Sequence, residues 1–159
     1  MRTKSATYFI CGIRYEKTME DGLQKKVTEQ YVIDALSFTE AEERITEEMS
    51  AYISGEFDVK TCAFAPFTEI FFSGDDNADK WYKAKIDFVS FDEKSGKEKR
   101  SHNYYLVQAG SIGSALSNID FVMGGTMIDY VVMSIQETPI IDVFEYKVKS
   151  DDGGGSTEA

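Results

Sequence analysis

Two stretches of the chain, TYFICGIRY (residues 7–15) and KWYKAKIDF (residues 80–88), carry the same alternation of side chains and decide the fold. Apolar residues at every second position line one face of a β-strand, so each stretch predicts a strand. The match continues through both halves of the chain, at a shift of 73 or 74 residues. We therefore interpret residues 7–73 and 80–146 as two copies of one unit. Matched pairs include Gly22 and Gly96, Ser37 and Ser111, Ala41 and Ala115, Ile45 and Ile119, and Met49 and Met123.

Each copy predicts two strands, a helix and a further bent strand, a ββαβ(β) unit. Glycines 22 and 96 mark the turns of two hairpins. Ser37 and Ser111 precede the helices, because a serine oxygen can accept a hydrogen bond from a free amide at a helix start. We expect an α+β protein with an antiparallel sheet, two helices on one side of it, and a pseudo-twofold axis. Whether the two half-sheets join edge to edge or stack is left open.

Length and composition indicate one globular domain. The chain has 159 residues, of which 42% are hydrophobic and 13% aromatic, enough for a packed core. We expect a single domain over residues 1–149 and a disordered tail over residues 150–159, which are small, polar and glycine-rich. No apolar run approaches the roughly 20 residues that span a membrane, and no signal-like stretch follows the N-terminus. We expect a cytoplasmic protein with no membrane contact.

The charge is strongly acidic overall but unevenly distributed. The net charge of −11 argues against non-specific affinity for nucleic acid. Residues 2–26 and 80–105, which contain the two predicted hairpins, nevertheless hold 13 of the 17 Lys and Arg residues and 7 of the 28 Asp and Glu residues. This segregation predicts a basic surface on an otherwise acidic protein.

Cations and aromatic rings alternate with the core positions of these hairpins. Such a surface suits single-stranded nucleic acid, because cations follow the phosphates and rings stack on the bases. The alternative is a solvated sheet face whose lysines discourage aggregation. The candidate ligand-binding residues are Arg14, Lys26, Trp81, Lys83, Lys85, Arg100 and Tyr104.

Residues with catalytic or metal-binding spacing do not stand out. Asp75–Asp79 has the alternating oxygen ligands of a calcium loop, but Lys80 replaces its turn glycine and Ile86 its closing glutamate. His102, the single histidine, has no partner that the sequence identifies. We therefore expect no catalytic residues, no metal and no cofactor, and a protein that is not an enzyme.

Four segments resemble an uncharacterised family of small proteins from Bacteroidetes-type bacteria and their phages, a domain of unknown function. The segments are KKVTE (residues 25–29), DALSFTEAE (34–42), ISGEF (53–57) and ETPIIDVF (137–144). The likeness extends over nearly the whole chain. It implies an intracellular or phage-encoded protein, and it brings no activity, cofactor or catalytic residue.

Together these observations favour a non-enzymatic binding protein that engages single-stranded nucleic acid or a nucleotide-like anion on the basic, aromatic hairpin face. Two alternatives stay open. One is a protein-interaction or structural module, such as a homo-oligomer that uses an exposed strand edge or the acidic helix near residues 40–48. The other is a phage-type protein that sequesters a small nucleotide in a pocket between the two copies.

Overall fold

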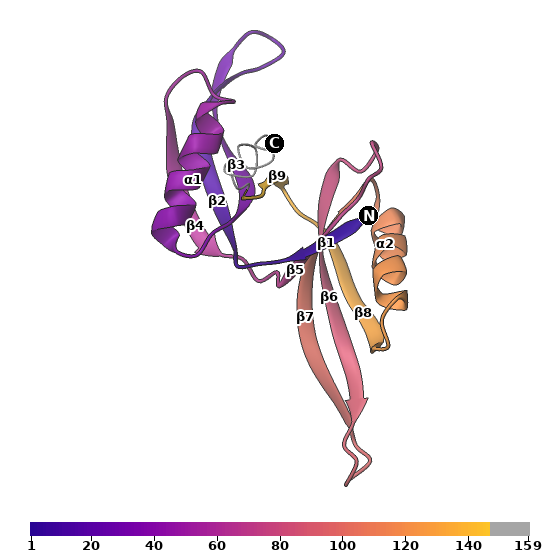
Figure 1. The fold of residues 1–159 in the computed structure, drawn as a ribbon. Coiled ribbons are helices and arrows are strands. Elements are labelled where there is room, and N and C mark those ends of the chain that lie inside the picture. Colours follow the sequence, from indigo (N-terminus) through magenta and orange to yellow (C-terminus); the bar gives the residue numbers. More distant parts are fainter. Residues whose placement is uncertain (147–159) are drawn as a thin grey trace, which may run out of the picture.

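The computed structural model describes residues 1–146, which form two sheets with one helix packed on each (Figure 1). Sheet A has the strand order β1 (Arg2–Ser5), β5 (Glu69–Phe72), β7 (Glu98–Ala109), β6 (Lys80–Phe91) and β8 (Asp129–Glu137). Sheet B has the order β4 (Phe57–Phe64), β2 (Tyr8–Thr18), β3 (Gln24–Asp34) and β9 (Ile140–Phe144). The helices are α1 (Phe38–Ser50) and α2 (Ile112–Gly124). The predicted tail falls outside the described residues.

The predicted α+β class is confirmed, with mostly antiparallel strands. The expectation left open how the half-sheets join. They do not join edge to edge, since the strands form two sheets, and each sheet carries one helix. Helix α1 packs on sheet B through Ala41, Ile45 and Met49, and α2 packs on sheet A through the matched Ala115, Ile119 and Met123. Each half therefore has a core of its own between one helix and one sheet.

Local contacts repeat between the two halves at the predicted shift. The Ser37 side chain caps α1 by accepting a hydrogen bond from the Glu40 amide, and Ser111 caps α2 through the Ser114 amide. Both hairpin turns place a glycine in the left-handed region, with φ of 84° at Gly22 and 69° at Gly96, where glycine carries no steric cost. These matched contacts are those that a duplicated unit would make, and the duplication itself stays a prediction.

The two halves exchange their last strands. Strand β5 follows α1 and β4 in the chain, yet it joins sheet A, where it runs parallel to β7. Strand β9 follows α2 and β8, yet it joins sheet B, where it runs parallel to β3. Because each sheet is completed by a strand from the other half, the two halves form one interlocked molecule.

A third core, the seam, lies where the two sheets meet. It is formed by side chains that point away from both helices, since Tyr8 and Val32 alternate with the residues that contact α1. Phe72 and Trp81 meet edge to face there, with ring centroids 5.8 Å apart. The buried seam residues are Tyr8, Val32, Phe67, Ile70, Phe72, Trp81, Leu106 and Ile140.

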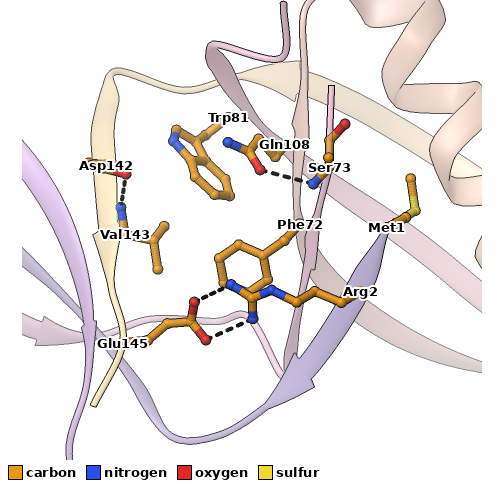
Figure 2. Close-up of a pocket in the computed structure, with 10 residues that line it drawn as sticks. Met1, Arg2, Phe72, Ser73, Trp81, Gln108, Asp142, Val143 and Glu145 are labelled. Carbon is orange, nitrogen blue, oxygen red and sulfur yellow. Dashed lines mark hydrogen bonds and ion pairs between the residues drawn. The ribbon is translucent and has the colours of Figure 1, made fainter. Parts of the chain in front are cut away.

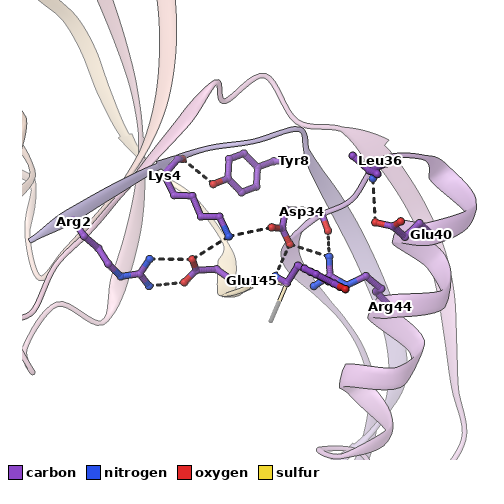
Figure 3. A network of polar contacts seen from close by, with 9 residues as sticks. Arg2, Lys4, Tyr8, Asp34, Leu36, Glu40, Arg44 and Glu145 are labelled. Atoms are coloured by element: carbon purple, nitrogen blue, oxygen red, sulfur yellow. Dashed lines mark hydrogen bonds and ion pairs between the residues drawn. The ribbon is translucent and has the colours of Figure 1, made fainter. Parts of the chain in front are cut away.

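A polar network beside the seam ties both ends of the described chain to sheet B (Figure 3). Arg2 on β1 forms an ion pair with Glu145, and Lys4 lies 3.4 Å from Asp34 Oδ2. The Asp34 carboxylate also accepts hydrogen bonds from Arg44 on α1, at 2.8 Å, and from the Tyr146 amide, at 2.8 Å. Asp34 is nearly buried, and these donors replace the water that its carboxylate loses.

Candidate functional site

The candidate site is the part of sheet A that faces away from α2 and extends beyond the seam, which we term the open face. Alternation along β6 places Tyr82, Ala84 and Ile86 against α2, so the residues between them lie on the opposite side. The hairpin register sets Lys85 opposite Tyr104 and Asp87 opposite His102. The open face comprises Lys83, Lys85, Asp87, Val89 and Phe91 on β6, and Glu98, Arg100, His102 and Tyr104 on β7. Glu98 forms an ion pair with Arg100, with its Oε2 2.9 Å from Arg100 Nε.

Two lysines and a tyrosine form the part of the open face nearest the seam. Lys83 and Lys85 are half-buried, two residues apart on β6. The Lys83 Nζ atom lies 5.0 Å from the centre of the Tyr104 ring, a cation–π distance. Within residues 1–146 neither lysine forms an ion pair. Their charges are therefore available to an anionic ligand.

Asp87, His102 and Arg100 form a charged cluster farther along the hairpin. The Asp87 side chain is 2% exposed, with Oδ1 2.6 Å from His102 Nδ1 and Oδ2 3.6 Å from Arg100 Nη1. An ionised carboxylate only accepts hydrogen bonds, so His102 Nδ1 is the donor. The His102 hydrogen bond, with the charges of Lys85 and Arg100 adding to it, lowers the pKa of Asp87 from its usual value. This fixed orientation leaves the opposite ring nitrogen, Nε2, on an exposed side chain.

Trp81 is oriented as predicted but is not available for stacking. It points away from α2, like Lys83 and Lys85, yet it is only 3% exposed because sheet B covers that end of β6. Its carbonyl accepts a hydrogen bond from the Thr138 amide at 2.9 Å, as the Tyr8 carbonyl does from Ala65 at 2.8 Å. The prediction that Trp81 lies on an exposed surface is therefore wrong, and its ring belongs to the seam.

Arg14 and Lys26 lie on the other hairpin, apart from the open face. Figure 1 shows the β2–β3 and β6–β7 hairpins projecting from opposite ends of the molecule. Arg14 and Lys26 line a cavity of about 520 Å³ that also contains Glu16, Glu56 and Asp58. The structure thus brings Lys83, Lys85, Arg100 and Tyr104 together and separates the two remaining cations, which have carboxylates for neighbours.

A second cavity, of about 410 Å³, lies between the two sheets (Figure 2). Its polar groups already have partners, since Arg2 pairs with Glu145 and the Gln108 side chain accepts from the Ser73 amide at 2.9 Å. Asp142 adds a second carboxylate to the lining. This chemistry does not favour the phosphates of a small nucleotide in the cavity between the copies.

Two features of the open face are missed by the sequence interpretation. The contact between Asp87 and His102 depends on hairpin register, which the turn over residues 92–97 sets, with Asp92 bonded to both Gly96 and Lys97 through the backbone. Phe91 is 62% exposed and lies on the same side as Lys83 and Lys85, at the end of the alternation. Counting the pairs of β6 and β7 residues outward from this turn would have indicated both features.

Metal-binding geometry is not found on this face. Among the described residues there is no cluster of three His, Cys, Asp or Glu side chains that could hold a metal ion. Likewise, no helix within residues 1–146 is long and apolar enough to cross a membrane.

The fold and the site define an α+β protein with two helix-covered sheets, joined through exchanged strands, and a cationic, aromatic face left open on one sheet. The chain belongs to the family described as Domain of unknown function (DUF4494), whose model matches residues 7–146. The predicted resemblance to an uncharacterised family is therefore confirmed. Comparisons with curated proteins and with solved structures found no match.

Proposed function

We propose that the protein is a non-enzymatic binding protein and that the open face of sheet A binds single-stranded nucleic acid. The observation that carries the proposal is the pair of lysines, Lys83 and Lys85, which are half-buried, adjacent on one face and without ion pairs in residues 1–146. The charge of Lys85 acts on Asp87 without a direct contact, so both lysine ammonium groups can still bind an external anion. Phosphate groups supply that anion at regular spacing.

Aromatic rings on the same face support a single strand over a duplex. The Tyr104 ring lies beside Lys83, and Phe91 is exposed near the end of the hairpin. A base can stack on such a ring only when it is not held inside a double helix, and each stacked base stabilises the complex by about 1–3 kcal/mol. The open face therefore combines cations for the backbone with rings for unpaired bases.

The His102–Asp87–Arg100 cluster supports the proposal in a second way. Asp87 orients the His102 ring on the open side of the sheet through the contact of 2.6 Å, and Arg100 is held there by Glu98, at 2.9 Å, and by Asp87, at 3.6 Å. Side chains that are already oriented lose less conformational entropy when a ligand binds. The bacterial or phage origin implied by the resemblance fits such a role and stays a prediction.

The experiment is a fluorescence anisotropy titration of labelled single-stranded DNA and RNA with the full chain, at low and moderate salt. We expect binding that weakens as salt rises, because displaced counterions favour association less at higher salt. Lys83→Gln combined with Lys85→Gln should weaken binding by about tenfold or more and make the salt dependence shallower by about two phosphate contacts.

The matched control combines Lys94→Gln with Lys97→Gln, two exposed lysines in the turn of the same hairpin. It changes the net charge by the same amount and leaves the open face intact, so it should retain binding. Arg14→Gln on the opposite hairpin should also have little effect. Absence of binding by the wild-type chain, or an equal loss in both double variants, would rule out the open face as a specific site.

A further inference from the structure

A free strand edge with apolar side chains on both of its sides borders sheet A at β8. Among residues 1–146, β6 is the one hydrogen-bonded neighbour of β8. Val131 and Met133, which are 38% and 47% exposed, lie on the side of the open face, where Arg100 Nη1 is 3.7 Å from Met133 Sδ. On the other side, α2 exposes Leu116 beside β8. Tyr130 on β8 donates a hydrogen bond to Asp120 on α2, so this face of α2 lies next to β8. Leu116 is one turn before Asp120 on the same face of the helix.

The other half of the molecule has the same edge with charged residues in these places. Strand β4 pairs with β2 as β8 pairs with β6, and each pair has a register shift at the matched place, Gly12/Ile13 and Lys85/Ile86. At positions matched by this register and by the sequence shift, Asp58 corresponds to Val131, Lys60 to Met133, and Glu42 on α1 to Leu116 on α2. The β4 edge therefore carries charged side chains suited to solvent, whereas the matched β8 edge carries apolar ones.

The β8 edge also lacks the features that keep free strands from associating. Residues 130–136, YVVMSIQ, contain no charge, proline or glycine. Charged side chains and proline are the usual means by which natural proteins protect an edge, and an uncharged, β-prone edge pairs with another strand. This surface is thus an interface that the described chain does not cover by itself.

We propose that the edge is covered by a second copy of this chain, through antiparallel pairing of β8 with β8 about a twofold axis. Residues 147–159, KVKSDDGGGSTEA, are too polar to cover an apolar edge. Pairing β8 of one copy with β4 of the next would give an open chain of copies, with a free strand edge at each end. It would also place Asp58 and Lys60 against apolar residues. A twofold β8 pair closes, because each copy offers the same uncharged edge to the other.

The acidity of the chain supports the same surface. Two copies with a net charge of −11 each repel, so a stable contact requires a surface with few acids. Residues 110–136, which include α2 and most of β8, contain Asp120 and Asp129 as their only charged residues. Asp120 is moreover occupied by Tyr130. Added salt should therefore strengthen the dimer, because it screens the repulsion between the rest of the two chains.

The symmetry has a definite structural consequence. An antiparallel pair of identical strands has its twofold axis perpendicular to the sheet, so both α2 helices lie on one side and both open faces on the other. In this dimer, the Leu116 side chains of the two copies lie near the twofold axis, on the helix side of the paired β8 strands. The two sheets A become one continuous sheet whose open faces adjoin.

The test is sedimentation velocity of the full chain from about 1 to 100 μM, a range that brackets a micromolar dissociation constant. We expect the wild-type chain to sediment with twice its 17.9 kDa mass at the upper concentrations. Met133→Lys and Leu116→Glu, which copy the residue types found at Lys60 and Glu42, should each raise the dissociation constant about a hundredfold. Lys60→Gln on β4 is the matched control and should leave it unchanged.

Hydrogen exchange identifies the edge that pairs. Amide protection of residues 130–136 should rise with protein concentration, while protection of residues 58–63 on β4 should not. Thermal unfolding of each variant checks that the substitution leaves the fold intact, since all the changed side chains are exposed. A wild-type chain that remains monomeric at about 100 μM, a dimer insensitive to both β8-side variants, or concentration-dependent protection at β4 instead would overturn the proposal.

Discussion

At the residue scale, Asp87 and Gly12 each occupy an environment that their residue type does not normally tolerate. Asp87 is a buried carboxylate, and it is stabilised by His102 and Arg100. Gly12 is a glycine inside a strand, where it normally weakens packing. Both positions lie beside the register shift of a central strand, Gly12 in β2 and Asp87 in β6. Each makes a specific prediction.

Replacing Asp87 by Asn should make the free energy of unfolding depend less on pH in the acidic range. The pKa of Asp87 is lowered chiefly by the His102 hydrogen bond, so the ionised carboxylate stabilises the folded state above the unfolded-state pKa of about 3.9. That contribution to stability is lost as the pH falls through the lower pKa that Asp87 has in the folded state. Urea unfolding should show the wild type more stable than Asp87→Asn at neutral pH and the difference shrinking below about pH 4. The exposed Asp129→Asn serves as control, and a gap that is constant with pH would contradict the assignment.

Gly12→Ala should destabilise the protein through a local clash. A methyl group at Gly12 would lie 2.5 Å from Thr61 Oγ1, the atom that accepts the Gly12 amide hydrogen bond at 3.1 Å. Displacing Thr61 strains a β-branched side chain and weakens this bond, at a cost of about 1–3 kcal/mol in the free energy of unfolding. Gly55→Ala, which meets no atom within 4 Å, should cost much less in the same urea titration. Equal losses would show that the effect does not come from Thr61.

At the scale of the element, α1 and α2 share their caps and their buried faces but differ in their exposed faces. Both begin at a serine whose backbone is extended, with φ of −154° at Ser37 and −156° at Ser111. The exposed side of α1 carries Glu42, whereas the matched place on α2 carries Leu116. The start of each helix is thus conserved between the halves while the solvent-facing surface is not.

Ser37→Ala and Ser111→Ala should each lower the free energy of unfolding by about 1 kcal/mol, because each removes the acceptor for an otherwise free amide. Chemical denaturation monitored by circular dichroism measures both effects. Ser117→Ala, at an exposed place in the middle of α2, should be neutral or slightly stabilising, since alanine favours helix. A neutral result at either cap would show that its amide finds another partner.

At the scale of the whole molecule, the exchanged strands make each half dependent on the other. Sheet A requires β5 and sheet B requires β9, and the seam buries side chains from both halves. A chain divided in the linker at residues 74–79 should therefore give two fragments that are unfolded alone and fold on mixing. Trp81, buried in the seam and the only tryptophan, reports this by fluorescence, with the uncut chain as reference. A fragment that unfolds cooperatively by itself would contradict the interdependence.

The sequence predicts the elements well and their assembly poorly. The alternation around residues 7–15 and 80–88, the glycine turns and the serine caps are local signals, and the structure has the strands, turns and helices that they predict. The same alternation is compatible with β5 in either sheet, so the exchange is not readable from it. Burial of Trp81 depends on how the sheets meet, and the Asp87–His102 contact on the register of one hairpin. Both are properties of assembly, which periodicity does not encode.

The reciprocal position of β5 and β9 also bears on how the protein is made. During translation the segment that forms sheet B emerges first, but its parallel edge at β3 is completed by residues 140–144, near the end of the described chain. Until those residues leave the ribosome, β3 has an unpaired edge with which strands of other nascent chains can pair. We therefore expect ribosomes that stall before residue 140 to release a species that requires chaperones, whereas the finished chain does not.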